Sequence, residues 1–174
     1  EMSLRKVLAL GKAEFELSAA HFELTECTRA LLTEVMQATQ TRYGLCLVRG
    51  FPVANWSKAE LRTLFWCLGL CCGVPRPQGK QSQYVSDVTN TGGTYRGGTG
   101  RGYNTNSKLD FHADGSDVVG LMCLHTAQSG GKTFYRLRAH GFEGEDEGGQ
   151  ARLQEPAPDA RGDEHAGLHA HIVA

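Results

Sequence analysis

The sequence predicts an α+β fold in residues 1–138, followed by a disordered tail in residues 139–174. Two long stretches repeat apolar residues at three- and four-residue steps, as the buried face of a helix does, and short apolar runs between turn residues indicate strands. From residue 139 the composition turns to Gly, Ala, Asp, Glu and Pro, with few large apolar side chains. Such a segment cannot bury enough surface to offset the entropy that it would lose on ordering.

A first helix is predicted over residues 18–41, with Ser18 or Thr25 capping its start. Charged and polar residues fall between its apolar positions, so one face should be buried. That face is expected to contain Leu24, Cys27, Leu31, Val35 and Ala38.

A short strand and a second helix follow the first helix. Residues 45–49 are apolar and lie between two glycines, which predicts a core strand. Residues 57–72 are predicted to form a helix, because Ser57 and Glu60 match a capping box and Gly73 is placed to end it. The buried stripe of this helix is expected to contain Leu61, Leu64, Phe65, Leu68 and Cys72.

The stretch LDFHADG contains a histidine and an aspartate two residues apart, His112 and Asp114. In an extended strand, such residues point to the same face. An imidazole nitrogen and a carboxylate oxygen, joined by a second histidine, form the facial triad of non-haem Fe(II) oxygenases. The pair is therefore the candidate metal site of the chain.

The residues around this pair also follow an ordered pattern. A long loop rich in Gly, Thr and Asn, residues 89–106, precedes the pair, and its glycines match neither a dinucleotide-binding motif nor a P-loop. After the pair, the apolar run of residues 117–124 predicts a strand buried on both faces. Gly130 and Gly131 then mark a turn before a strand that opens near Thr133.

In these features the chain resembles the taurine dioxygenase-like (TauD/TfdA) family of Fe(II)/2-oxoglutarate dioxygenases. The resemblance runs over about residues 44–135. It is carried by the segments GLCLVRGFP, NWSKAEL, GVPRPQ, YNTNSKLDFHADGSDVVGLMCL and SGGKT.

The resemblance implies a partial double-stranded β-helix, or jelly roll, with the N-terminal helices packed on it. It implies that His112 and Asp114 bind iron and that Thr133 hydrogen-bonds the co-substrate 2-oxoglutarate. Such an enzyme uses O₂ to hydroxylate a small organic substrate and releases succinate and CO₂. The loop would cover that substrate, so Tyr103, Thr105 and Asn106 are weak candidate substrate contacts. The alternative for this loop is a plain flexible connector.

The resemblance ends before the second half of the family's barrel, where a further iron-binding histidine and the arginine that binds 2-oxoglutarate are expected. Three histidines near the end of the chain, His165, His169 and His171, could supply a metal ligand. The Gly- and Ala-rich composition around them argues against a stable helix, and we expect a solvated tail. The sequence therefore predicts a truncated dioxygenase that binds Fe(II) weakly.

Composition limits the other roles of the chain. It has 174 residues, 40% of them hydrophobic, and a formal net charge of −1, which gives no footprint for nucleic acid or anionic membranes. No secretion signal or membrane-spanning segment is visible, so a cytoplasmic location is the default expectation. The six cysteines lack zinc-type spacing and are expected to be reduced and mostly buried. The alternative is a metal or redox role for Cys67 and Cys71, which would lie one helical turn apart.

Two functions remain open from sequence. The first is the Fe(II)/2-oxoglutarate-dependent dioxygenase, impaired in this chain by truncation. The second is a non-catalytic fragment that serves as an interaction module or has no function of its own, because half of a jelly roll exposes sheet edges and part of its core. The sequence does not select the substrate or the oligomeric state.

Overall fold

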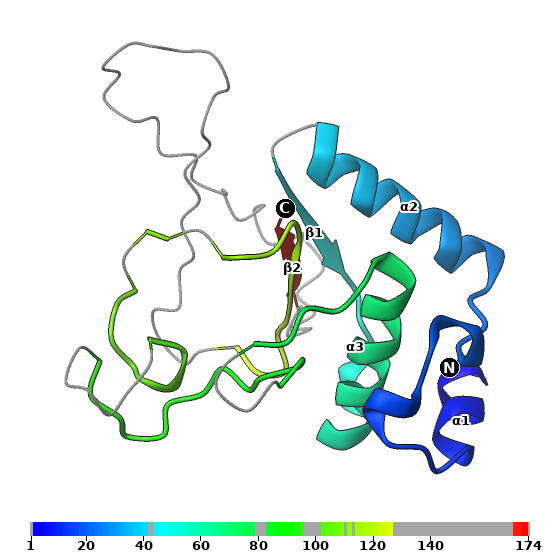
Figure 1. Ribbon diagram of the computed structural model, residues 1–174, viewed down its shortest axis with the longest axis horizontal. Helices are drawn as coiled ribbons and strands as arrows, with labels where there is room; N and C mark the ends of the chain where they lie inside the picture. Colours follow the sequence, from blue (N-terminus) through cyan, green and yellow to red (C-terminus); the bar gives the residue numbers. More distant parts are fainter. Residues whose placement is uncertain are drawn as a thin grey trace, which may run out of the picture. The chain divides into compact units, whose positions relative to one another are not determined.

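The computed structural model describes residues 2–41, 44–78, 83–95, 102–109, 111–112, 114–126 and 169–173 (Figure 1). The chain divides into two compact units, which we describe separately. Unit 1 contains Glu1–Gly73 and Ser116–Ala174, and unit 2 contains Val74–Gly115. The predicted boundary between residues 138 and 139 falls outside the described residues.

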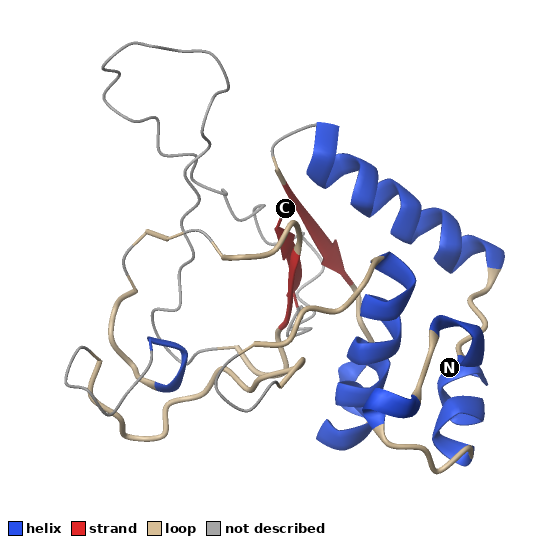
Figure 2. Ribbon diagram, viewed as in Figure 1, coloured by secondary structure: helices blue, strands red, loops and turns tan. Residues whose placement is uncertain are grey.

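Three α-helices of unit 1 pack together (Figure 2). They are α1 (Met2–Ala9), α2 (Glu26–Thr41) and α3 (Lys58–Cys72). Short 3₁₀ turns lie between them: η1 (Glu14–Glu16), η2 (Ala19–His21) and η3 (Val53–Asn55). Helix α1 contacts α3, and its Leu4 and Val7 are each only 2% exposed. These two residues form part of the helical core, which sequence analysis did not assign to this segment.

Helix α2 begins later than the sequence predicts. Ser18 caps the short turn η2 instead, where its backbone N–H donates to Nδ1 of His21 at 3.0 Å. Thr25 is the cap of α2, since its hydroxyl accepts from the backbone N–H of Thr28 at 3.3 Å. Because the helix is capped at Thr25, the residues before it form the separate turn η2.

The buried face of α2 is rotated relative to the prediction. Val35 and Ala38 are buried as expected, but Cys27 is exposed and Leu31 is 45% exposed. Thr39, which the prediction did not include, is buried. Its hydroxyl donates to the carbonyl oxygen of Met36 at 2.8 Å, so this buried polar group has a hydrogen-bond partner. The positions of β1 and α3 decide which face of α2 is covered.

The predicted boundaries of α3 are confirmed. The backbone N–H of Glu60 donates to the hydroxyl of Ser57 at 3.3 Å, and the backbone N–H of Ser57 donates to the carboxylate of Glu60 at 2.7 Å. Gly73 follows the last helical residue and donates its N–H to the carbonyl of Gly69. Both ends of the helix are therefore satisfied locally.

The predicted buried stripe of α3 is only partly correct. Leu61 is buried, whereas Leu64, Phe65, Leu68 and Cys72 are half-buried. The most protected side chains are Trp66 and Cys67, which are 7% and 0% exposed. Helix α3 contacts α1, α2 and η2, so a wider arc of its surface is covered than a single stripe would require.

The strands of the described residues form one antiparallel sheet, in the order β1-β3-β2. Strand β1 is Leu45–Arg49, as predicted, β2 is Val119–Met122 and β3 is His169–Val173. The expected burial of residues 117–124 on both faces is wrong, because Gly120 and Leu121 are exposed. Strand β2 lies at an edge of this sheet, where fewer elements cover it.

Strand β3 corrects the expectation of a tail disordered to its end. Its five residues pair with β1 on one side and β2 on the other. Main-chain hydrogen bonds to two neighbours supply the ordering energy that the composition of the tail lacks. The described strands form a single sheet, so they do not by themselves display the two facing sheets of a jelly roll.

Unit 2 consists mainly of loop among its described residues, with the 3₁₀ turn η4 (Gly102–Asn104) and an isolated bridge between Gln78 and Gln83. The described parts of residues 89–106 thus agree with the predicted loop.

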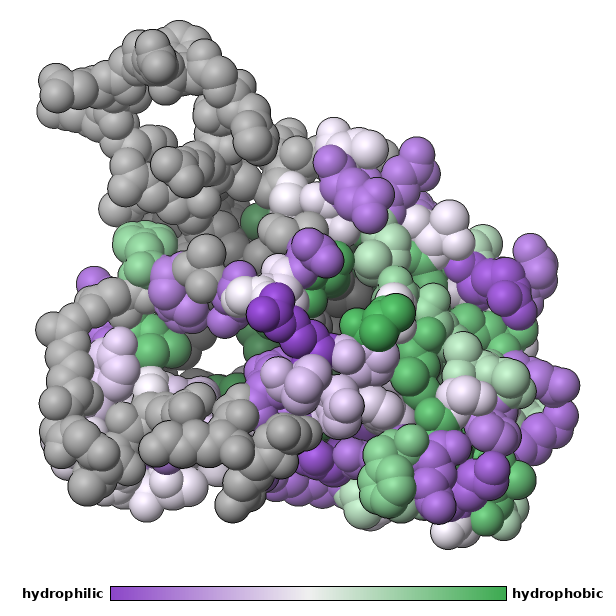
Figure 3. Space-filling model, viewed as in Figure 1, coloured by the Kyte–Doolittle hydropathy of each residue, from purple (hydrophilic) through white to green (hydrophobic). Residues whose placement is uncertain are grey.

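The face of the molecule in Figure 3 shows apolar and polar side chains interspersed over the helices of unit 1. No described helix has the length and apolar character needed to cross a membrane.

Two glycines provide a matched test of packing. A methyl group at Gly69 of α3 would meet no atom within 4 Å, whereas one at Gly120 of β2 would lie 3.1 Å from Cζ of Phe65. We expect Gly69→Ala to raise the free energy of unfolding by about 0.5–1 kcal/mol. We expect Gly120→Val to lower it by about 1–3 kcal/mol through overpacking against Phe65. Urea unfolding measures both, and equal effects would contradict the Phe65–Gly120 contact.

The capping box of α3 predicts a pH dependence. Hydrogen bonds from the hydroxyl and the backbone N–H of Ser57 hold the pKa of Glu60 below its ordinary value of 4.5. A carboxyl whose pKa is lowered by folding stabilises the fold above its unfolded pKa and loses this effect as the pH falls through its folded pKa. Glu60→Gln should therefore be less stable than wild type at pH 7, and the difference should vanish well below pH 4.5.

Urea unfolding over a pH series measures this difference. The exposed Glu34 in the middle of α2 serves as the control, because Glu34→Gln leaves the capping box intact. Ser57→Ala removes the cap and should lower the free energy of unfolding by about 1 kcal/mol at pH 7. A pH-independent difference for Glu60→Gln would contradict the role of the ionised carboxylate.

Candidate metal centre

The side chains of His112 and Asp114 come together in unit 2. Nε2 of His112 lies 3.9 Å from Oδ1 of Asp114, and the two side chains are 56% and 57% exposed. Neither residue is part of a strand, so the predicted strand is wrong for these two positions.

The separation suits two ligands of one metal ion. Zinc-type bonds to imidazole and carboxylate are about 2.1 Å, so one ion can join atoms up to about 4.2 Å apart. Two ligand atoms bound at right angles to one ion would be about 3.0 Å apart. A side-chain rotation that shortens the Nε2–Oδ1 distance from 3.9 Å would reach this separation. Both side chains are more than half exposed, so space for that rotation is present.

Arg76 fixes the chain directly after this pair. Its guanidinium donates a hydrogen bond to the carbonyl oxygen of Gly115, the residue that follows Asp114. Arg76 lies between Pro75 and Pro77, which have no backbone N–H and restrict the chain to an extended course. The segment around Arg76 is part of the family resemblance, but no sequence pattern gave Arg76 a role, because its contact joins residues distant in sequence.

The two described arms of the loop before the pair are held together by hydrogen bonds. The backbone N–H of Thr89 donates to the carbonyl of Tyr103 at 3.1 Å, and that of Thr91 donates to the carbonyl of Asn104 at 3.0 Å. Gly92, at φ 80°, turns the chain and donates its N–H to the side chain of Asn90. The described arms of the loop therefore contact each other through main-chain hydrogen bonds.

The three candidate substrate contacts differ in their surroundings. Tyr103 is 38% exposed and Asn106 is exposed. The hydroxyl of Thr105 donates to the carbonyl of Gly102 at 3.2 Å and accepts from the N–H of Ser107 at 3.3 Å. Thr105 therefore already uses its hydroxyl to shape the turn.

Asn104 is a further polar residue of this loop. Its Oδ1 is buried and has no hydrogen-bond partner among the described residues. A buried amide oxygen without a donor is costly. The sequence carried no signal that distinguished Asn104 from its polar neighbours, because the burial of its Oδ1 is a property of the folded loop.

All six cysteines belong to unit 1, whereas the candidate pair belongs to unit 2. All six are free thiols, and Cys27 is exposed. Burial raises the pKa of Cys67 to about 11 and also raises the pKa of Cys71 and of Cys72. A raised pKa makes these thiols poorer metal ligands, because the thiolate is the form that binds a metal. Among the residues that the structure describes, no three His, Cys, Asp or Glu side chains cluster.

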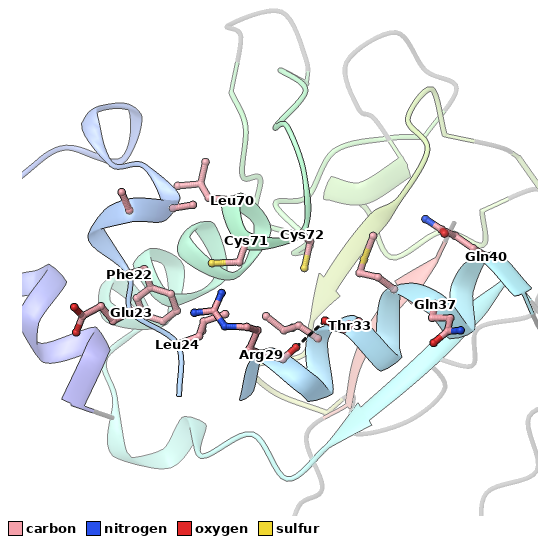
Figure 4. A pocket seen from close by; sticks show the side chains of 14 residues that line it. Phe22, Glu23, Leu24, Arg29, Thr33, Gln37, Gln40, Leu70, Cys71 and Cys72 are labelled. Carbon is pink, nitrogen blue, oxygen red and sulfur yellow. Dashed lines mark hydrogen bonds between the residues drawn. The ribbon is translucent and has the colours of Figure 1, made fainter. Parts of the chain in front are cut away.

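A separate groove of about 780 Å³ lies in unit 1, between η2, α2 and the end of α3 (Figure 4). Phe22, Leu32 and Leu70 contribute apolar surface to it. Figure 4 shows Arg29 extending from α2 toward Cys71. No residue of the candidate metal pair lines this groove.

The comparison with known proteins identifies the family. Residues 7–135 match the family described as taurine catabolism dioxygenase TauD, TfdA. The chain belongs to this family. It is also similar to FR-33289 synthase of Streptomyces rubellomurinus, with 27% identity over 139 residues. That match covers 79% of this chain and 39% of the synthase, so the chain spans about two fifths of that relative's length.

TauD/TfdA proteins are typically Fe(II)/2-oxoglutarate dioxygenases. The nitrogen of His112 and the oxygen of Asp114 are donor atoms that fit Fe(II). A neutral imidazole nitrogen and a carboxylate oxygen are both ligands of non-haem Fe(II). Thr133 and His165 lie outside the described residues. His169 and His171 belong to β3, of which the backbone alone is described. The described part of the candidate site therefore consists of the His112–Asp114 pair and the Arg76 contact.

The Arg76 contact predicts an effect on metal binding. Arg76→Gln should weaken Fe(II) binding several-fold and speed hydrogen exchange of the amides around Gly115, because the guanidinium no longer holds the Gly115 carbonyl. Arg76→Lys should restore part of both, since lysine donates to a carbonyl but lacks the planar fork. The exposed Lys108 of the same unit provides the control Lys108→Gln. Unchanged exchange in Arg76→Gln would contradict the positioning role.

Proposed function

We propose that this chain is part of an Fe(II)/2-oxoglutarate-dependent dioxygenase, with His112 and Asp114 as two protein ligands of the iron. The approach of their side chains to 3.9 Å, in a member of the TauD/TfdA family, carries the proposal. When bound, Fe(II) with 2-oxoglutarate and O₂ hydroxylates a small organic substrate and yields succinate and CO₂. The coverage of 39% of the similar synthase supports a whole enzyme larger than this chain.

Each residue has a stated task in this proposal. His112 offers a neutral nitrogen lone pair, and Asp114 offers a negatively charged oxygen that lowers the charge of the site. Arg76 holds the backbone that follows Asp114. Tyr103 and Asn106 contact substrate from the exposed side of the loop, and Thr105 supports the turn between them. Thr133 hydrogen-bonds 2-oxoglutarate, on the basis of the family resemblance alone.

A second function, a non-catalytic interaction module, is favoured by apolar side chains that unit 2 leaves in solvent. Val74, Val88 and Phe111 are 96%, 68% and 60% exposed. Exposed apolar surface of this kind promotes association. The two functions are separated by metal binding, because the interaction module does not require His112 or Asp114.

Anaerobic titration with Fe(II) tests the ligand assignment. The 174-residue chain should bind weakly, because the part of the chain that the structure describes brings only two candidate ligands together and water would occupy the other positions. His112→Ala and Asp114→Asn should each weaken this binding at least about tenfold, which corresponds to about 1.4 kcal/mol. His125→Ala, at an exposed histidine of unit 1, should leave it unchanged. Equal binding by all four proteins would exclude the assigned pair.

Succinate release tests the reaction. A longer protein that contains this chain should release succinate from 2-oxoglutarate in an Fe(II)-dependent manner, whereas the 174-residue chain should remain at background. Robust turnover by the 174-residue chain that is lost in His165→Ala, His169→Ala or His171→Ala would show instead that the tail completes the catalyst. Turnover by the longer protein that survives His112→Ala would refute the ligand role of His112.

A further inference from the structure

The groove between η2, α2 and the end of α3 is formed entirely by residues of unit 1 (Figure 4). Its volume of about 780 Å³ falls within the range of about 300–1,000 Å³ that is usual for small-molecule sites. None of its lining residues has a task in the proposed iron chemistry. The groove is therefore a candidate for a second binding site.

Apolar side chains from all three elements contribute to the wall of the groove. Leu32 and Met36 belong to α2, Leu70 belongs to α3, and Ala19 and Ala20 belong to η2. Leu32, Met36 and Leu70 are only half-buried, so part of their apolar surface stays accessible. Covering such a surface with an aliphatic chain is favourable, because it removes apolar area from water.

Arg29 supplies the positive charge of the groove. Among the described residues that line it, Arg29 is the only lysine or arginine, and Figure 4 shows its side chain extending from α2 toward Cys71. Burial raises the pKa of Cys71, and the charge of Arg29 acts against this rise, which agrees with a guanidinium close to that thiol. No carboxylate in the part of the chain that the structure describes forms an ion pair with Arg29.

The acidic residue of the groove is already paired. Nζ of Lys6 donates to the carboxylate of Glu23 at 3.0 Å, and Figure 4 shows this carboxylate directed away from Arg29. The hydroxyl of Thr33 donates to the backbone carbonyl of Arg29 at 3.0 Å, so this bond leaves the guanidinium unused. The groove thus offers one positive charge, which favours a ligand with a single negative charge.

We propose that this groove binds a monocarboxylate with an aliphatic chain. The carboxylate pairs with Arg29, and the chain lies against Leu32, Met36 and Leu70. A planar guanidinium donates two parallel hydrogen bonds to a carboxylate, which matches this head group in shape and in charge. An anion without a chain would leave the apolar wall in water, and a neutral chain would leave the guanidinium unpaired. This inference does not depend on the metal site.

Calorimetric titration of the full 174-residue chain with octanoate tests the site. Octanoate should saturate at one molecule per chain, and Arg29→Gln should weaken its binding at least about tenfold, because a charged pair of hydrogen bonds is lost. Arg29→Lys should restore part of the affinity, since lysine keeps the charge but lacks the fork. The exposed Arg49 of β1 does not line the groove, so the matched control Arg49→Gln should bind octanoate as wild type does.

Three further probes separate the contributions of the head group and the chain. Hexanoate should bind more weakly than octanoate by about fourfold for each missing methylene group. Acetate keeps the carboxylate and octan-1-ol keeps the chain, and each should bind at least about tenfold more weakly than octanoate. In isotopically labelled protein, octanoate should shift the amide resonances of Thr33 and Leu70, which lie on opposite helices of the groove.

Circular dichroism confirms that each variant keeps its helices before the affinities are compared. Octan-1-ol binding as tightly as octanoate, or equal octanoate affinity of wild type and folded Arg29→Gln, would overturn the proposal. Absence of octanoate binding to the folded wild-type chain would overturn it as well. Sedimentation tests another occupant, because a wild-type dimer that Leu32→Asp dissociates would assign the groove to a second copy of the chain and exclude the carboxylate.

Discussion

The burial of α3 is the constraint on which unit 1 depends. Cys67, near the middle of this helix, is fully buried, and α1, α2 and η2 all contact α3. Arg62 extends from the same helix to Glu14 of η1, with Nε 2.5 Å from Oε1 and Nη2 3.3 Å from Oε2. This two-pronged ion pair is about one-third exposed and so fixes orientation more than it adds stability.

The helices also determine the form of the sheet. Helix α2 contacts β1, and Phe65 of α3 lies against Gly120 of β2, so helices cover both outer strands of the sheet. Residues at the end of the chain form the strand between these two, although their composition is poor in large apolar side chains. Main-chain pairing on two sides can order a segment that cannot order itself by burial.

The candidate metal centre follows a different logic. The side chains of His112 and Asp114 approach to 3.9 Å and remain more than half exposed. Two exposed ligands leave most of an ion's coordination sphere to water, which makes the pair a weak site in isolation. The proposed role of the pair as iron ligands rests on membership of the TauD/TfdA family.

The sequence by itself determined the features that depend on neighbouring residues: the Ser57–Glu60 cap, the end of α3 at Gly73, strand β1 and the proximity of His112 to Asp114. Only the tertiary structure decided which helix faces are buried, that β2 lies at a sheet edge, that β3 orders the end of the chain and that Arg76 reaches Gly115. Caps and i, i+2 spacings are set by a few successive dihedral angles. Burial, strand partners and long-range hydrogen bonds depend on elements that are distant in the sequence, and periodicity in one segment carries no information about them.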